Sequence, residues 1–147
     1  MEIIKGKHSF NLDEFLEKPL FAHLSTSSTE GPRDSPVWVL WKDKCLWIIG
    51  THGDTFPLRI KEEPSCAIGI VDFNPSTGKV LHAGFRGKAT VEPFDINLAK
   101  HLFTKYLGPN ENIWDSRFKD QDPNNVFIRF VPETVVVRNQ SYKVDES

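Results

Sequence analysis

The residues best suited to chemistry lie in a short polar loop, Thr51-His52-Gly53-Asp54-Thr55, between an apolar run and a predicted helix. The side chains of Thr51, His52 and Thr55 can all donate hydrogen bonds to phosphate oxygens. The first backbone N–H groups of a helix are unpaired, and the helix dipole favours an anion beside them. The loop therefore predicts an anion-binding site, although a plain turn uses the same residue types.

Two arginines could add positive charge to this site. Arg59 lies one turn into the predicted helix, so its guanidinium could reach back to a phosphate or point into solvent. Arg86 lies between Gly84 and Gly87, and glycines on both sides would leave room for a flat ligand. A barrel-rim ion pair is the alternative explanation for Arg86.

Tryptophans are the other candidates for ligand contact. Trp38, Trp41 and Trp47 lie in runs that read as buried strands, so we expect them in the core or in a dimer interface. One of them could still flank an aromatic ring system. Trp114 lies in an otherwise polar segment, where it either anchors the loop or covers a ligand.

No other group of residues predicts catalysis or a metal site. The five histidines are scattered, and the chain has neither a CxxC nor an HExxH pattern, so we expect no metal site. No side chain stands out as an obligatory acid or base. Cys45 and Cys66 lie in apolar strand patterns, where we expect buried free thiols in a reducing cytoplasm.

Length and composition narrow the class of protein. A chain of 147 residues is enough for one domain, which we expect to span residues 1–147. The net charge of −2 argues against a nucleic-acid partner, which usually selects a basic surface. No apolar run approaches the roughly 20 residues that a membrane span requires, and the start resembles no secretory signal. We therefore expect a cytoplasmic protein without a membrane or nucleic-acid partner.

Two aromatic and β-branched runs flank the chemistry. Pro36–Trp41 and Cys45–Gly50 predict an antiparallel hairpin around the charged turn Lys42-Asp43-Lys44. The predicted helix after the polar loop spans Thr55 to about Glu63, with Asp54 as its N-cap.

The remaining patterns predict a mainly β, antiparallel barrel with peripheral helices. The predicted helices are Asn11–Glu17 and Asp95–Leu107. The other predicted strands are Leu20–Ser25, Ser65–Phe73, Lys79–Val91, Val126–Val131 and Thr134–Arg138, with Met1–His8 as a possible edge strand. Glycines inside Lys79–Val91 indicate a bulge or bend. The tail Asn139–Ser147 is polar and is expected to fray.

Several segments in order resemble the pyridoxamine 5'-phosphate oxidase-like, FMN-binding split-barrel family. They are Leu46-Trp-Ile-Ile-Gly-Thr51, the glycine and hydroxyl loop, the helix with Arg59, and Glu63-Pro-Ser-Cys-Ala-Ile68. Phe15–Thr26 is similar to the family's opening helix and first strand, and Gly84–Val91 is similar to a later barrel strand. The resemblance covers most of Asn11 to Arg138.

The resemblance implies a Greek-key-like split barrel that forms a homodimer with FMN at the subunit interface. FMN would perform hydride or electron transfer on a small molecule, which the sequence does not identify. Its phosphate would lie against Thr51–Thr55, with Arg59 as the nearest cation. Its isoalloxazine ring would run along Ser35, Pro36, Val37 and Trp38, towards Arg86 or a residue of the partner subunit.

The chain departs from the family where positive charge is expected. Pro36 and Trp41 stand where pyridoxamine-phosphate oxidases carry arginine and lysine, and Asp54-Thr55-Phe56 stands where many flavin-binding members have Ser-Arg-Lys. A phosphate relies on charge-assisted hydrogen bonds, about twice as strong as neutral ones. We therefore expect an FMN-binding oxidoreductase-like protein that is not a working pyridoxamine-phosphate oxidase. The alternative is a non-catalytic binding module on the same fold that has lost flavin or binds haem or deazaflavin.

Overall fold

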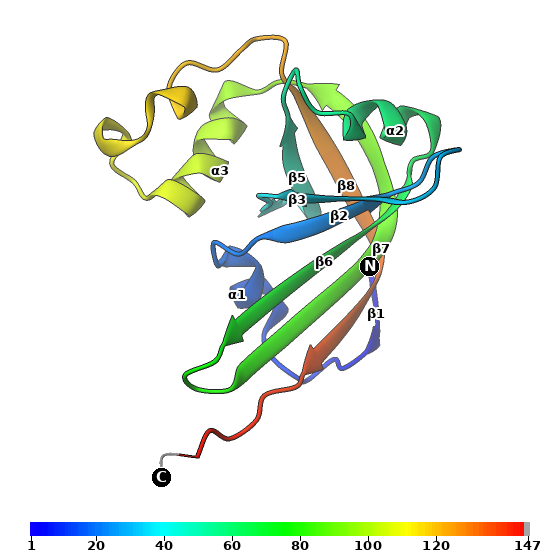
Figure 1. Ribbon diagram of the computed structural model, residues 1–147, viewed down its shortest axis with the longest axis vertical. Helices are drawn as coiled ribbons and strands as arrows, with labels where there is room; N and C mark the ends of the chain where they lie inside the picture. Colours follow the sequence, from blue (N-terminus) through cyan, green and yellow to red (C-terminus); the bar gives the residue numbers. More distant parts are fainter. Residues whose placement is uncertain (146–147) are drawn as a thin grey trace.

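The computed structural model describes residues 1–145 and contains a single curled sheet with helices packed around it (Figure 1). Its strands are β1 Glu2–Lys5, β2 Ala22–Thr26, β3 Arg33–Val37, β4 Leu40–Lys42, β5 Cys45–Gly50, β6 Ser65–Asn74, β7 Lys79–Pro93 and β8 Val126–Asn139. Its helices are α1 Leu12–Glu17, α2 Phe56–Glu62 and α3 Ile96–Leu107, with short 3-10 turns at Glu111–Ile113 and Ser116–Phe118.

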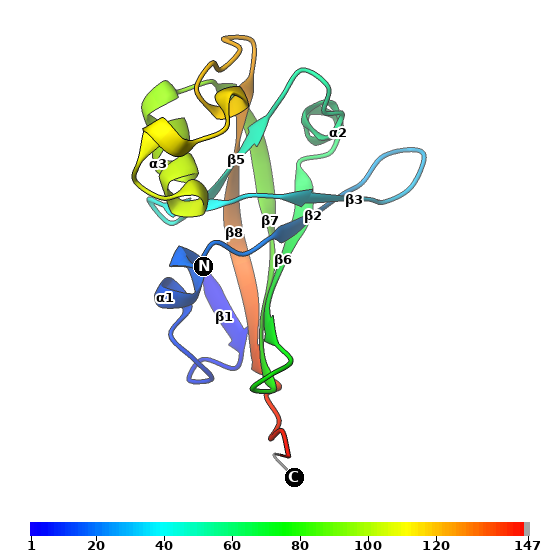
Figure 2. The same cartoon turned by 60° about the vertical axis from the view of Figure 1, so that its left-hand side comes forward.

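The sheet confirms the predicted antiparallel, barrel-like class. Its strand order is β3-β2-β6-β7-β8-β5-β4, and every pair along this path is antiparallel. The short β1 joins β8 in parallel. The long strands β6, β7 and β8 form the wall, while α3 lies on one side of it and the β2–β3 loop extends on the other (Figure 2). Because β3 and β4 end the path, the sheet curls into a half-barrel with two open edges.

Two apolar clusters hold these elements together. The first fills the barrel interior, with Phe15, Phe85 and Phe130 among its fully buried side chains. The second lies under α3, where Leu102 and Phe103 pack on neighbouring strands and loops. Side-chain caps fix the starts of α1 and α3. The Asn11 side chain accepts from the Glu14 N–H, and the Asp95 side chain accepts from the N–H groups of Asn97 and Leu98.

The prediction of one strand over Pro36–Trp41 is wrong. β3 pairs with β2 and ends at Val37, and the chain then changes direction through Trp38 and Val39 before β4 pairs with β5. The hairpin turn itself is the two-residue Asp43-Lys44, with φ values of 53° and 59°. This left-handed pair matches the turn type that two-residue hairpins favour.

The last two predicted strands are in fact one continuous strand, β8. Pro132 cannot donate to the sheet, and the β7–β8 register shifts opposite it, between Arg86 and Gly87. A Cβ on Gly87 would lie 2.2 Å from the Val131 carbonyl oxygen, so only glycine fits this close approach. The irregularity expected at the glycines of β7 does occur beside Gly87, but the extra residue, Glu133, belongs to β8.

The described part of the tail is better ordered than the sequence predicts. The Gln140 N–H donates to the Val80 carbonyl at 2.8 Å, and the Tyr142 N–H donates to the Gly78 carbonyl at 2.9 Å. Glu146 and Ser147 lie outside the described residues. Within residues 1–145, no helix is both long and apolar enough to cross a membrane.

Candidate functional site

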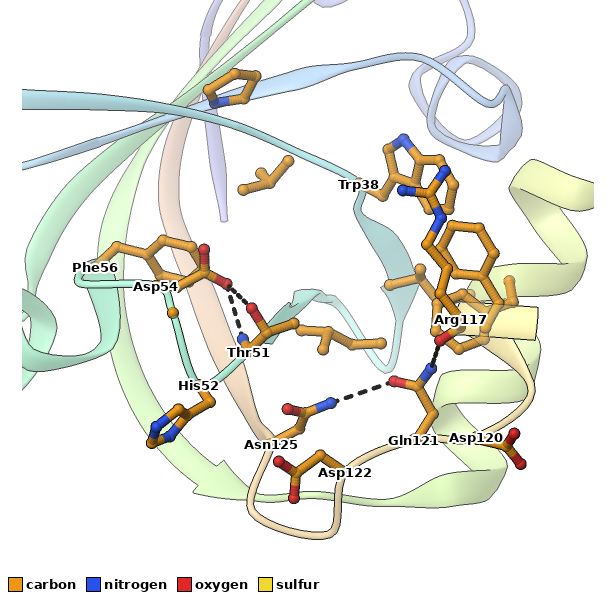
Figure 3. Close-up of a pocket in the computed structure, with 17 residues that line it drawn as sticks. Trp38, Thr51, His52, Asp54, Phe56, Arg117, Asp120, Gln121, Asp122 and Asn125 are labelled. Atoms are coloured by element: carbon orange, nitrogen blue, oxygen red, sulfur yellow. Dashed lines mark hydrogen bonds between the residues drawn. The ribbon is translucent and has the colours of Figure 1, made fainter. Parts of the chain in front are cut away.

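A cavity of about 580 Å³ opens where the end of β3, the loop after β5, α3 and the segment Ser116–Asn125 meet (Figure 3). We call it the aromatic cavity, because rings form much of its wall. The apolar lining comprises Val37, Trp38, Ile49, Phe56, Leu102, Phe103 and Phe118. Its polar lining comprises Thr51, His52, Asp54, Arg117, Asp120, Gln121, Asp122 and Asn125.

Trp38 forms the centre of an aromatic stack beside this cavity. Its ring stacks with Tyr106 at a centroid distance of 4.6 Å and with Phe118 at 5.5 Å. The Tyr106 hydroxyl donates to the Leu20 carbonyl at 2.7 Å and accepts from the Val39 N–H at 3.0 Å. These two bonds join α3 to the residue region before β2 and to the residue region after β3. They therefore hold the Trp38 side of the cavity wall in place.

Lys105 reinforces the same junction between α3 and the barrel. Its ammonium donates to the Leu16 carbonyl at 2.8 Å and to the Val39 carbonyl at 2.6 Å. Burial lowers the pKa of Lys105 to about 8, and burial raises the pKa of Tyr106 to about 12. Both groups serve to dock α3 on the barrel.

In the polar loop, Asp54 turns back to Thr51. Its carboxylate accepts from the Thr51 N–H at 2.8 Å and from the Thr51 hydroxyl at 2.9 Å (Figure 3). Asp54 is therefore not the helix N-cap that the sequence predicts. Thr55 occupies that position, without a side-chain capping bond, and α2 begins at Phe56. The donors of Thr51 are thus already taken by a negative charge.

A second depression, of about 620 Å³, is lined by Ser35 of β3 and by Thr55 and Arg59 at the start of α2, and we call it the Arg59 pocket. Its other charged lining residues are Glu30, Arg33, Asp34 and Glu62. The Arg59 side chain is held by two hydroxyls. Its Nε donates to the buried Thr26 hydroxyl at 2.8 Å, and its Nη1 donates to the Thr55 hydroxyl at 2.6 Å. A guanidinium has five N–H donors, so further donors remain for a ligand. The Thr55 hydroxyl accepts from Arg59 and can donate its own hydrogen.

These two sites divide most of the predicted site residues between them. Those lining the aromatic cavity are Pro36, Val37, Trp38, Thr51 and His52. Those lining the Arg59 pocket are Ser35, Thr55 and Arg59. The two groups are adjacent, because Ser35 precedes Pro36 on β3 and Asp54 precedes Thr55. Arg86 is separate: it lines a third depression with Cys66 and Glu133.

A pair of amide side chains in the aromatic cavity was not predicted from the sequence. Asn125 Nδ2 donates to Gln121 Oε1 at 3.3 Å, and Gln121 Nε2 donates to the Arg117 carbonyl at 2.9 Å. Asn125 is only 6% exposed. Both residues lie in a polar, irregular segment without periodicity, so no spacing in the sequence marks them.

Trp114 and the two cysteines lie outside both sites. Trp114 is buried, and its indole N–H donates to the Gly108 carbonyl at 3.0 Å, which confirms it as a loop anchor. Cys45 is buried and Cys66 is half-buried, and both are free thiols. Burial raises the pKa of Cys66 to about 11. Among the described residues, no three His, Cys, Asp or Glu side chains gather as a metal site would require.

No protein-family model matches the sequence, and no curated protein is detectably similar to it. Solved structures do match. A conserved hypothetical protein from Mycobacterium tuberculosis has 17% identity and a TM-score of 0.73, over 99% of this chain and 96% of that one. An F420 reductase has 23% identity and a TM-score of 0.63, over 86% of this chain and 96% of that one.

HutZ, the haem storage protein from Vibrio cholerae, has 15% identity and a TM-score of 0.65, over 88% of this chain and 93% of that one. A candidate pyridoxamine 5'-phosphate oxidase from Listeria innocua has 16% identity and a TM-score of 0.64. At these identities the matches establish the fold. The chain has the split-barrel fold of the pyridoxamine 5'-phosphate oxidase-like proteins, as the sequence resemblance predicts.

Proposed function

We propose that this protein binds FMN and uses it for redox chemistry on a small molecule. The proposal depends on one observation. An aromatic cavity on an open strand edge lies directly beside a guanidinium that two hydroxyls hold in place. FMN joins an aromatic ring to a phosphate, so the two neighbouring sites match its two parts.

The ring would occupy the aromatic cavity along Ser35–Trp38. β3 is an edge strand, because β2 is its only strand partner within residues 1–145. Its outer backbone groups are therefore free of the sheet and can bond a heterocycle. Thr51 and His52 line the same cavity and would contact the ligand there.

The phosphate would lie at Thr55 and Arg59. Charge-assisted N–H donors and a hydroxyl form the set that a phosphate monoester needs. The loop position expected from the sequence is less suitable, because Asp54 already accepts both donors of Thr51. Arg59 thus supplies the cation that the loop lacks. Arg86 lies in a separate depression, where it could meet the ring only if the ligand or a partner subunit reached that far.

When bound, FMN supplies hydride or electron transfer, and the protein supplies position and polarity. Trp38 and Phe118 would exclude water from one side of the ring. His52 is exposed at the cavity mouth, where a small substrate would approach. We place this chemistry in the cytoplasm, where both cysteines would remain thiols.

We further propose that the protein acts as a homodimer. Val71 and Phe73 lie two residues apart on β6 and are 50% and 55% exposed, so they offer an apolar strip that a second copy of the chain could cover. We expect an interface above roughly 2,000 Å² in total. Light scattering at micromolar concentration should give the mass of a dimer, and a monomer would contradict this part of the proposal.

The function is tested by titrating FMN and riboflavin into the purified protein and following the quenching of flavin fluorescence. Riboflavin has the same ring without the phosphate. We expect FMN to bind at least about tenfold more tightly, because a charged hydrogen bond contributes about 1.5–3 kcal/mol. If neither flavin binds, or both bind equally, the proposed placement is wrong.

A second candidate is favoured by the carboxylates around the cavity, Asp54, Asp120 and Asp122. They would repel a phosphate, so a non-catalytic module that has lost flavin remains the alternative. Parallel titrations with deazaflavin and haem separate the two candidates: binding of haem or deazaflavin without FMN would favour the second.

The shortage of cations also predicts that pyridoxamine 5'-phosphate is not a substrate. Cofactor and substrate would each need a phosphate site, and Arg59 can serve only one. The FMN-loaded protein should therefore produce no pyridoxal 5'-phosphate under oxygen. Steady turnover in an absorbance assay for the aldehyde would overturn this prediction.

A further inference from the structure

Asn125 holds a hydrogen-bond acceptor in a fixed orientation. The chain of bonds starts at the Arg117 carbonyl, which can only accept, so the Gln121 amide must turn its nitrogen towards it. The Gln121 oxygen then faces Asn125 and receives a hydrogen bond from Nδ2. The amide of Asn125 is thereby oriented, and its Oδ1 points away from Gln121 (Figure 3).

The carbonyl oxygen of Asn125 faces the aromatic cavity. None of the described residues donates a hydrogen bond to Oδ1, although Asn125 is 94% buried. The described residues contain no fully buried side-chain nitrogen or oxygen that lacks a partner. Oδ1 therefore reaches open volume, and the only cavity that Asn125 lines among those described is the aromatic one.

Once a ligand displaces water from the cavity, this acceptor requires a donor from the ligand, since a buried polar group without a partner costs free energy. The other polar groups fixed nearby do not provide one. Asp54 is itself an acceptor, and the Thr51 hydroxyl already donates to Asp54. The cavity thus presents an acceptor to whatever occupies it.

We propose that Asn125 Oδ1 accepts the N3–H of the bound flavin and so determines which edge of the ring enters the cavity. This inference rests on the proposed function. The oxidised isoalloxazine ring carries a single N–H group, at N3, while its other heteroatoms on that edge are acceptors. Gln121 is a positioning residue, because it acts on the ligand only through Asn125.

The consequence is selection against rings alkylated at N3. A site built to hydrogen-bond a donor discriminates strongly against an analogue that lacks it, because the buried acceptor is then left unpaired. N3-methyl-FMN keeps the phosphate and the ring but has no donor at this position. It is therefore the matched probe for Asn125.

The experiment measures the affinities of FMN and N3-methyl-FMN for wild type, Asn125→Ala, Asn125→Asp and Asn124→Ala. Wild type should prefer FMN by about tenfold or more. Asn125→Ala should lose this preference. Asn125→Asp still accepts but cannot donate to the Gln121 oxygen, so it should keep only part of the preference. Asn124 is exposed and lies outside the cavity, so Asn124→Ala should behave as wild type. The ratio of two affinities does not depend on the fraction of protein that is folded.

Two failures are distinguishable. If wild type binds FMN and N3-methyl-FMN equally, or if the preference survives in Asn125→Ala, the role of Asn125 is overturned while FMN binding stands. If wild type binds neither compound, the proposed function itself is overturned, and the role of Asn125 with it.

Discussion

The aromatic cavity and the Arg59 pocket are lined by consecutive residues of β3 and of the loop before α2, yet they differ in chemistry. The cavity combines rings with acceptors, whereas the pocket combines hydroxyls with two arginines, Arg33 and Arg59. Carboxylates line both: Asp54, Asp120 and Asp122 in the cavity, and Glu30, Asp34 and Glu62 in the pocket. In the pocket, hydroxyls fix the guanidinium of Arg59 with donors to spare. A ring and an anion can therefore be bound by separate parts of the protein, the ring by the aromatic cavity and the anion by the Arg59 pocket. Loss of basic residues from the loop therefore does not exclude phosphate binding, because Arg59 lies one turn further along the helix.

The largest effect should come from breaking the cavity wall with Trp38→Ala. This change removes the stack with Tyr106 and Phe118, and truncating a fully buried large ring costs about 3–5 kcal/mol, so the half-buried Trp38 should cost somewhat less. Both flavins should then lose affinity, and the free energy of unfolding should fall. Denaturant unfolding measures the loss. Ile113→Ala, at an exposed position, is the control and should change stability by less than about 0.5 kcal/mol.

Arg59→Ala should remove the phosphate contact in the Arg59 pocket and leave the aromatic cavity unchanged. We expect FMN affinity to fall by about 1.5–3 kcal/mol and riboflavin affinity to remain unchanged, since only FMN has a phosphate. Arg129→Ala removes an exposed arginine of β8 and serves as the charge-matched control. Equal loss for both flavins would mean that Arg59 acts on the fold and not on the phosphate.

Asp54→Asn should strengthen FMN binding and leave riboflavin binding unchanged. The variant keeps an oxygen to accept from Thr51 but removes a negative charge close to the Arg59 pocket. FMN should bind more tightly by about 1 kcal/mol, the scale of two charges 4 Å apart in water. Riboflavin is the internal control. Weaker binding of FMN would show that the loop geometry matters more than its charge.

The smallest effect should be a pH dependence of stability that comes from Lys105, which joins α3 to the barrel. Burial lowers the pKa of Lys105 to about 8, so above that pH the folded state holds fewer protons at this position than the unfolded state. Stability should therefore rise with pH between about 8 and 10, relative to Lys105→Met, by less than about 1 kcal/mol per pH unit. Thermal unfolding at several pH values measures the difference. A flat or falling difference would contradict the role of burial.

Much of the fold could be predicted from local patterns. The apolar stripe of α3 and its Asp95 cap are local features, as are the alternating strands, so they appear in the sequence. The break in Pro36–Trp41 could not be predicted, because Trp38 leaves the sheet to stack on Tyr106 from distant α3. The continuity of β8 through Pro132 likewise depends on a bulge at Glu133 and on Gly87 of the partner strand β7, which lets the two backbones approach closely.

The site was predictable only in part. Local spacing singled out the polar loop and Arg59, because both flank a helix start. It could not reveal that Asp54 would bond Thr51 instead of capping α2, since both geometries suit an aspartate three residues from a threonine. Asn125 and Gln121 reach the cavity because an irregular segment folds over α3 and β5. Such a segment has no sequence periodicity from which its position could be predicted.

The central claim is that one ligand spans both sites, with its ring in the aromatic cavity and its phosphate at Arg59. A crystal structure of the protein with FMN tests it most directly. We expect phosphate oxygens within hydrogen-bonding distance of the Arg59 guanidinium and the Thr55 hydroxyl. We expect the ring to lie along Ser35–Trp38. A phosphate bound at Thr51 and His52, or a flavin bound away from both sites, would contradict it.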